Sequence, residues 1–133
     1  MRYPIILCVP IVLLFSMQRL QAESEYDNLR AEDKAIAAAN TKLDRIYQQI
    51  LGSLDGKIAD GDAHANDLKR TLIAAERAWI KWRDAEALFR VYEGGSVGGS
   101  ALNEDLHQNM LDLIGERRKF LEKCWKDLNI KSE

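Results

Sequence analysis

Proline and cysteine are scarce in this chain of 133 residues. Both prolines, Pro4 and Pro10, lie within the first ten residues, so no later proline interrupts a helix. The two cysteines are Cys8 and Cys124. If the first 22 residues are removed, Cys124 alone is left, and a single thiol cannot close a disulfide within one chain. The folded domain must then be stabilised by packing rather than by a cross-link.

Long apolar runs are also missing, apart from one near the N-terminus. The run Ile5–Phe15 is shorter than the ~20 residues that a helix needs to cross a bilayer. Arg2 precedes this run, and the small residue Ala22 follows it before an acidic stretch. This order is typical of a secretory signal peptide over residues 1–22, cleaved after Ala22, and an uncleaved anchor is the alternative. We expect a periplasmic or secreted protein whose mature part does not span the membrane.

An excess of basic residues is absent too. The net charge is −2, and it falls to −4 when Arg2 and Arg19 leave with the signal peptide. Proteins that bind nucleic acid present a basic surface, so we expect no nucleic acid partner. Residues 23–133 have the length of one domain, and we expect a single helical domain there. Its acidic balance weakly favours a basic partner.

Residue clusters that carry chemistry are missing as well. His64 and His107 have no second histidine or cysteine at the spacing of a zinc site. Residues 60–71 faintly resemble a calcium-binding loop, but Ala65 stands where that loop needs glycine and Thr71 where it needs glutamate. No serine or cysteine nucleophile lies beside a plausible base. We therefore expect no metal, no cofactor and no enzymatic activity.

What the chain does contain is three helical patterns separated by glycine. Glycine-rich stretches at 52–61 and 94–99 leave helices of about residues 30–54, 67–92 and 101–128. Each helix repeats apolar residues every three or four positions, as a helix with one buried face does. Short connections make successive helices antiparallel, so the pattern predicts an all-α fold, an antiparallel up-down-up three-helix bundle. The predicted core face of the second helix consists of Leu68, Leu72, Ala75, Trp79, Trp82, Ala85 and Phe89.

Polar and glycine residues indicate where these helices begin and end. Asn66 or Asp67 can cap the second helix, because a short polar side chain accepts hydrogen bonds from the free amide groups there. Ser100 can cap the third helix in the same way. Gly94 and Gly95 can adopt the left-handed backbone that commonly ends a helix.

The stretch Glu76–Ala87 is similar to the pattern Gln-x-x-Trp-x-x-(aromatic)-Arg-Asp-x-Glu-Cys. This is the central motif of the lysozyme-inhibitor LprI family of small exported bacterial proteins, which the chain resembles. Weaker matches to the family's other motifs lie at Leu43–Tyr47, Gly98–Ser100 and Leu113–Leu121. The resemblance covers about residues 35–122. It implies a small exported protein that binds and inhibits lysozyme.

Two departures from the family pattern concern cysteine. Ala87 stands where the family commonly has a cysteine, and Asn109 stands where its second cysteine is expected. Both halves of the disulfide that the resemblance implies are therefore absent together. Such a cross-link between the second and third helices is worth ~2–4 kcal/mol in a small domain. Without it, a binding loop of the family kind is less rigidly held.

The candidate binding residues lie on the second and third helices and in the turn between them. They are Trp82, Arg83, Asp84, Arg90, Gly98, Gly99, Ser100 and Arg117. Asp84 and Glu86 could hold the arginines in ion pairs between the helices, or an arginine could face a partner. The turn could be a simple connection, or a recognition loop that reaches the catalytic carboxylates of a glycosidase.

Three further residues are expected to be structural. Trp79 lies on an apolar face, although either tryptophan of this helix could instead line a groove. Tyr47 has a hydroxyl that needs a partner when buried, and a hydrogen bond to the arginine and carboxylate groups would supply one. Cys124 lies on the apolar face of the third helix, and an intermolecular disulfide is its alternative role.

These observations favour an exported helical binding protein, with lysozyme inhibition implied by the family resemblance alone. The alternatives are an immunity-like protein that neutralises a periplasmic toxin, and a non-enzymatic accessory protein of the cell envelope. In the first two cases the partner is another protein, either a lysozyme-like hydrolase or a toxin. The oligomeric state stays open.

Overall fold

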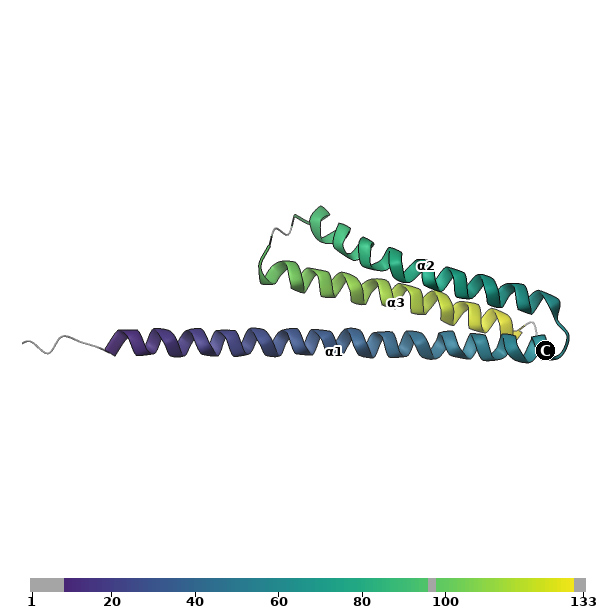
Figure 1. Cartoon of the computed structure of the whole chain (residues 1–133), viewed down its shortest axis with the longest axis horizontal. Helices are drawn as coiled ribbons and strands as arrows, with labels where there is room; N and C mark the ends of the chain where they lie inside the picture. Colours follow the sequence, from purple (N-terminus) through teal and green to yellow (C-terminus); the bar gives the residue numbers. More distant parts are fainter. Residues whose placement is uncertain (1–8, 96–97, 131–133) are drawn as a thin grey trace, which may run out of the picture. The chain divides into compact units, whose positions relative to one another are not determined.

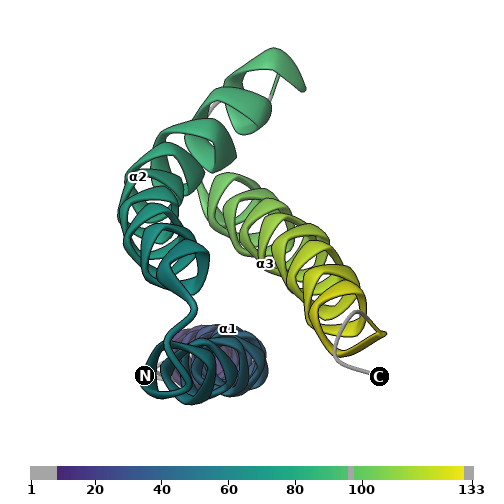
Figure 2. The same cartoon turned by 90° about the vertical axis from the view of Figure 1, so that its right-hand side faces the viewer.

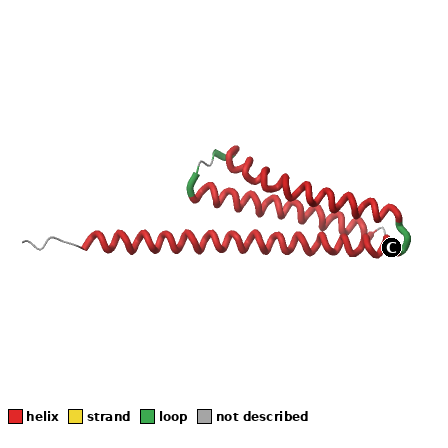
Figure 3. The backbone as a smooth tube through the Cα atoms, viewed as in Figure 1, coloured by secondary structure: helices red, strands yellow, loops and turns green. Residues whose placement is uncertain are grey.

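The computed structural model describes residues 9–95 and 98–130, and every element within them is an α-helix (Figure 1, Figure 3). Helix α1 spans Val9–Ala59, α2 spans Ala63–Glu93 and α3 spans Ser100–Ile130. The predicted all-α three-helix bundle is confirmed. None of the described helices combines the length and the apolar character needed to cross a bilayer.

The chain divides into two compact units, Met1–Lys34 and Ala35–Glu133. The first unit contains the N-terminal part of α1. The second contains the rest of α1 together with α2 and α3, and every side-chain contact described below lies within it. In this second unit α2 runs back alongside α1 and α3 reverses direction again, as Figures 1 and 2 show.

Helix α1 is longer at both ends than the sequence predicted. It begins at Val9 rather than near residue 30, and it continues through Gly52 and Gly56 to Ala59. Glycine inside a helix costs roughly 1 kcal/mol relative to alanine, which did not suffice to end this one. Ile50 and Leu54 are almost completely buried on the same face, and their packing holds the last turns helical.

The connection between α1 and α2 is short and has its own cap. Gly61 adopts a φ of 90°, a conformation that suits glycine. The side chain of Asp62 accepts hydrogen bonds from the amides of His64 at 2.9 Å and Ala65 at 3.2 Å. The helix therefore begins at Ala63, and the prediction that Asn66 or Asp67 caps it near residue 67 was wrong. Asp62 was the better candidate because it directly follows a glycine turn.

The other connection agrees more closely with the prediction. Gly95 is left-handed, with a φ of 79°, as predicted. Gly94 is not, because its φ is −69° and its amide still donates to the Arg90 carbonyl at 3.0 Å. Helix α3 has Ser100 as its first residue, and a cap by the Ser100 side chain stays a prediction.

The core lies between the C-terminal part of α1 and the other two helices. Its buried members are Leu43, Ile46, Ile50, Leu54, Ala65, Ile114 and Leu121. Polar contacts hold the same surfaces together. Lys57 of α1 donates to the Leu128 carbonyl of α3 at 3.2 Å, and Lys69 of α2 forms an ion pair with Asp55 of α1. The apolar face predicted for the first helix is thus the face that packs inward.

Helix α2 is rotated relative to the prediction. Of its predicted core face, only Leu72 and Trp79 are even partly buried, and the other five residues are exposed. The buried positions are instead Ala65, Glu76, Ala87 and Val91. Two of these are alanines, whose small side chains allow the helices to approach closely. Phe120 of α3 is a large apolar residue that is likewise exposed.

Candidate functional site

The inward face of α2 carries an ion pair with α3. Arg117 Nε and Nη2 donate to Glu76 Oε2 at 3.0 and 2.9 Å. The two side chains are 14% and 11% exposed, so water screens this pair weakly. The Arg117 guanidinium also lies 5.8 Å from the Trp79 ring centre and 5.3 Å from that of Phe120. Charge and aromatic contacts therefore fix Arg117 in place.

Arg83 extends this polar cluster to α1. It donates to Asp84 Oδ1 from Nε at 2.8 Å and from Nη2 at 2.7 Å, and to Asn40 Oδ1 at 3.3 Å. Its guanidinium lies 5.4 Å from the Trp79 ring centre. Trp79 thus contacts two guanidinium groups, an arrangement that is favourable when the cations are partly desolvated. We name Asn40, Glu76, Trp79, Arg83 and Arg117 the inner polar cluster.

Arg90 lies nearer the C-terminal end of α2 and is held by two carboxylates. Its Nε donates to Glu86 at 3.0 Å within α2, and its Nη1 is 3.9 Å from Glu116 of α3. The sequence predicted that Asp84 or Glu86 would join the second and third helices. In the structure both carboxylates pair with arginines of α2 itself. The ion pairs between α2 and α3 are Glu76 with Arg117 and Arg90 with Glu116.

Tyr47 of α1 lies beside the inner polar cluster. Burial raises the pKa of its hydroxyl, and the negative charge of Glu76 raises that pKa further. The described residues show no hydrogen bond from this hydroxyl. The predicted hydrogen bond to the cluster is therefore not formed, and Tyr47 interacts with Glu76 only through its charge.

The outward face of α2 is apolar, although it is exposed along its whole length. We name its residues the outer stripe: Leu68, Thr71, Ala75, Ala78, Trp82, Ala85, Phe89 and Tyr92. Their spacing alternates strictly between three and four residues. Trp82 is 48% exposed, Phe89 59% and Tyr92 62%. Large aromatic groups with this much exposure indicate a surface that binds a partner.

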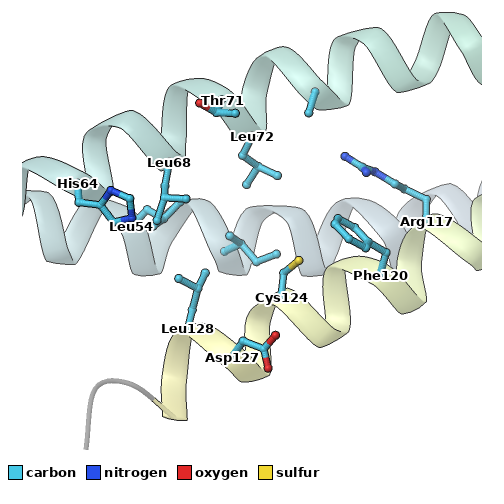
Figure 4. A pocket seen from close by; sticks show the side chains of 12 residues that line it. Leu54, His64, Leu68, Thr71, Leu72, Arg117, Phe120, Cys124, Asp127 and Leu128 are labelled. Atoms are coloured by element: carbon cyan, nitrogen blue, oxygen red, sulfur yellow. The ribbon is translucent and has the colours of Figure 1, made fainter.

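An apolar groove lies beside the N-terminal half of the outer stripe (Figure 4). It has a volume of about 480 Å³. Leu68, Thr71 and Ala75 belong to both the stripe and the groove. The remaining lining residues come from all three helices: Ile50, Leu54, His64, Leu72, Arg117, Phe120, Cys124, Asp127 and Leu128. His64 and Arg117 lie towards opposite ends of the groove, and the Cys124 sulfur points into it.

The described glycines of the loop between α2 and α3 are exposed. Gly95, Gly98 and Gly99 have φ values of 79°, 81° and 80°, and all three are exposed. A Cβ atom added at any of them would meet no other atom within 4 Å. The backbone of this loop is thus open to an approaching partner. Ser96 and Val97 lie outside the described residues.

The predicted site residues separate into two groups. Arg83, Arg90 and Arg117 take part in ion pairs, as the structural alternative expected. Trp82, Asp84, Gly98 and Gly99 are exposed. The structure therefore divides the predicted set between arginines held in ion pairs and residues exposed at the surface. Within the described ranges, no three histidine, cysteine or acidic side chains come together as metal ligands.

Sequence reasoning missed Glu76, the residue that organises the inner polar cluster. A signal for it was present. Glu76 lies four residues after Leu72 and three before Trp79, on the one face of α2 that both share. An acidic residue on such a face is rarely buried unless it is paired, and the pairing partner is the arginine of the third helix.

Comparison with known families decides where this chain belongs. A family described as "Lysozyme inhibitor LprI" matches residues 17–121, which include all of α2, the loop and most of α3. The chain belongs to the LprI family. Searches of curated proteins and of solved structures gave no match. The family's description names an inhibitor of a protein rather than a catalyst, which fits the expectation of a binding protein without enzymatic activity.

The two positions at which the family commonly has cysteine differ in burial. Ala87, at the place of the family's first cysteine, is completely buried against the other helices. Asn109, at the place of the second, is partly buried. Arg90, three residues after Ala87, pairs with Glu86 within α2 and lies 3.9 Å from Glu116 of α3.

Proposed function

We propose that this protein is exported and inhibits a lysozyme-type hydrolase by binding it. The observation that carries the proposal is membership of the LprI family over residues 17–121. The signal-peptide pattern of residues 1–22 supports export, because lysozymes act on the cell wall outside the cytoplasm. The net charge of −4 in the mature chain favours association with a basic enzyme.

We assign the contact to the loop between α2 and α3. Gly98 and Gly99 are exposed and carry no side chains, so a partner can approach their backbone closely, whereas the Gly95 amide already donates to the Tyr92 carbonyl at 3.1 Å. Lysozyme-type enzymes hold two carboxylates beside the bond that they cleave. Backbone amides in a turn are suitable donors to such anions. The loop would enter the cleft and present its amides to these carboxylates, while the helices keep it at a fixed distance from the core.

The test is a cell-wall lysis assay with a c-type lysozyme and the purified chain, either wild type or Gly98→Trp. A bulky side chain in the loop would block entry into the cleft, so inhibition should be lost. Gly61→Trp is the matched control. Gly61 is also an exposed glycine with positive φ and free surroundings, but it lies at the opposite end of α2. Circular dichroism would establish that both variants are folded.

Each outcome of this assay has a distinct meaning. Inhibition that is lost in Gly98→Trp and kept in Gly61→Trp supports the loop as the contact. Inhibition that survives in both variants places the contact on another surface. If the wild-type protein does not inhibit at a large molar excess, lysozyme is not its target, and a toxin becomes the next candidate to test.

A further inference from the structure

The outer stripe of α2 is an apolar helix face with no cover in the described chain. We propose that a second copy of this chain covers it, through antiparallel pairing of the two α2 helices about a two-fold axis at the level of Ile80. This interface is separate from the loop to which hydrolase binding is assigned. The spacing of the stripe, its self-complementarity, its continuity with the groove and its area support this pairing.

The spacing of the outer stripe calls for a helical partner. Positions that alternate at three and four residues repeat every seven residues. The stripe keeps this spacing from Leu68 to Tyr92, and seven of its eight residues are apolar, with Thr71 as the exception. Such a repeat presents one continuous seam to another helix. An irregular protein surface would not require it.

The order of side chains along the stripe is complementary to its own reverse. With the axis at Ile80, Trp82 of one copy faces Ala78 of the other, and Phe89 faces Thr71. Ala75 then faces Ala85, so the two backbones can approach closely at that layer. A parallel pair would instead place Trp82 against Trp82 and Phe89 against Phe89, with alanines opposite alanines, and would leave the helices unevenly separated.

The same alignment fills the groove. It brings Phe89 and Tyr92 of the second copy to the level of Thr71 and Leu68, which line the groove. Phe120 forms part of the other wall and is itself half exposed. Aromatic rings that enter a pocket are the usual anchors of an interface. The stripe and the groove therefore make one continuous surface. In the two-fold dimer, this surface of each copy contacts the same surface of the other copy.

The available area is sufficient for a reversible dimer. At ~200 Å² for each aromatic side chain, the exposed fractions of Trp82, Phe89 and Tyr92 give on the order of 340 Å² per copy. Two copies contribute about 700 Å² from these rings alone, and the rest of the stripe and the groove walls bring the total towards the ~1,200 Å² of small specific interfaces. We expect association in the micromolar range.

One charged residue reports the direction of pairing. Lys81 flanks the stripe, and in the antiparallel arrangement it lies near Lys81 of the other copy, where like charges repel. In a parallel arrangement it would lie near Glu86 of the other copy, where opposite charges attract. Replacement of Lys81 therefore has opposite effects in the two cases.

Sedimentation of the protein expressed from the full chain, with reductant to keep Cys124 free, tests the proposal. The wild type should pass from monomer to dimer between about 1 and 500 µM. Phe89→Asp should weaken association by at least about tenfold. Ile80→Asp, which replaces an exposed apolar residue of α2 outside the stripe, should leave association nearly unchanged. Lys81→Ala should strengthen it.

A wild-type protein that stays monomeric over this range would overturn the proposal. Equal weakening by Phe89→Asp and Ile80→Asp would also do so, because it would show a contact that is not specific to the stripe. Weaker association of Lys81→Ala would overturn the antiparallel direction. Thermal unfolding of each variant by circular dichroism separates a lost interface from a lost fold.

Discussion

The inward face of α2 carries more charge, and its outward face more large aromatic residues, than is usual. The inward face carries Glu76, Arg83 and Arg90, whereas the outward face carries Trp82 and Phe89. In most helices at the surface of a domain, the charged residues face water and the apolar ones face the core. The difference shows that the apolar pattern of a helix identifies a surface that tends to be buried. The pattern does not show whether the same chain or another molecule buries it.

The inward face tolerates its charges because they are satisfied. In the described part of the chain, every buried side-chain nitrogen or oxygen has a hydrogen-bond partner. Burial without partners would cost several kcal/mol for each charge. The ion pair of Glu76 with Arg117 therefore specifies how α2 sits on α3, and the outward face is left to interact with other molecules.

The largest expected effect comes from removing one partner of the ion pair between Glu76 and Arg117 on the inward face. Glu76→Leu leaves the Arg117 guanidinium largely buried without a counter-charge. We expect it to lower the free energy of unfolding by about 3–5 kcal/mol in urea denaturation, measured at a dilute, monomeric concentration.

Glu76→Gln is the control for this change. It keeps the shape and one hydrogen-bond acceptor, and glutamine is the residue of the family's motif at this place, so the loss should be clearly smaller. A Glu76→Leu variant as stable as wild type would show that the inner polar cluster does not hold α2 in position.

A second change compares the faces through volume alone. Ala87 is completely buried and Ala85 is exposed two residues away. Ala87→Leu should cost about 1–3 kcal/mol, because the added methyl groups have no space in the packed interface. Ala85→Leu should change the unfolding free energy by no more than ~0.5 kcal/mol. Thermal or urea unfolding of the two variants, side by side, gives the comparison, and equal losses would contradict the assigned rotation of α2.

The smallest effect concerns the pH dependence of stability. The pKa of Tyr47 is raised in the folded protein by burial and by Glu76. Above the ordinary tyrosine pKa of about 10, the unfolded chain loses this proton while the folded protein keeps it. Stability from this group is therefore present below pH ~10 and falls as the pH rises from there to the folded pKa.

Tyr47→Phe removes the ionisable hydroxyl. The variant therefore serves as the reference against which the contribution of this hydroxyl in the wild type is measured. The difference in unfolding free energy between wild type and Tyr47→Phe should depend on pH only in the alkaline range. A difference that stays constant from neutral to alkaline pH would show that the hydroxyl is not coupled to folding.

The sequence predicted the number, type and order of the helices correctly, because periodicity over long segments is a strong signal. The predicted helix boundaries are wrong where a glycine-rich stretch predicts the end of a helix. Gly52 and Gly56 lie in a helix whose opposite face is buried, and tertiary packing outweighs their weak local preference. Asp62 was missed because the boundary had been placed four residues too late.

The candidate site was predictable only in part. The loop glycines and the pairing of the arginines follow from residue type and spacing. The rotation of α2 could not be foreseen, because its outward residues are more apolar than its inward ones. The shared face of Leu72, Glu76 and Trp79 is visible in the sequence, but the pairing of Glu76 with Arg117 on another helix is a relation between distant segments.

Helix α1 runs through Ala22 without interruption, and this continuity has an electrostatic consequence. The first turn of the uncut helix contains no acidic residue. Cleavage after Ala22 would make Glu23, Glu25 and Asp27 the opening residues of the shortened helix. The aligned peptide dipoles of a helix place partial positive charge at its start, and each carboxylate there contributes about 0.3–1 kcal/mol. Maturation would thus give α1 a negatively charged beginning that its own dipole stabilises.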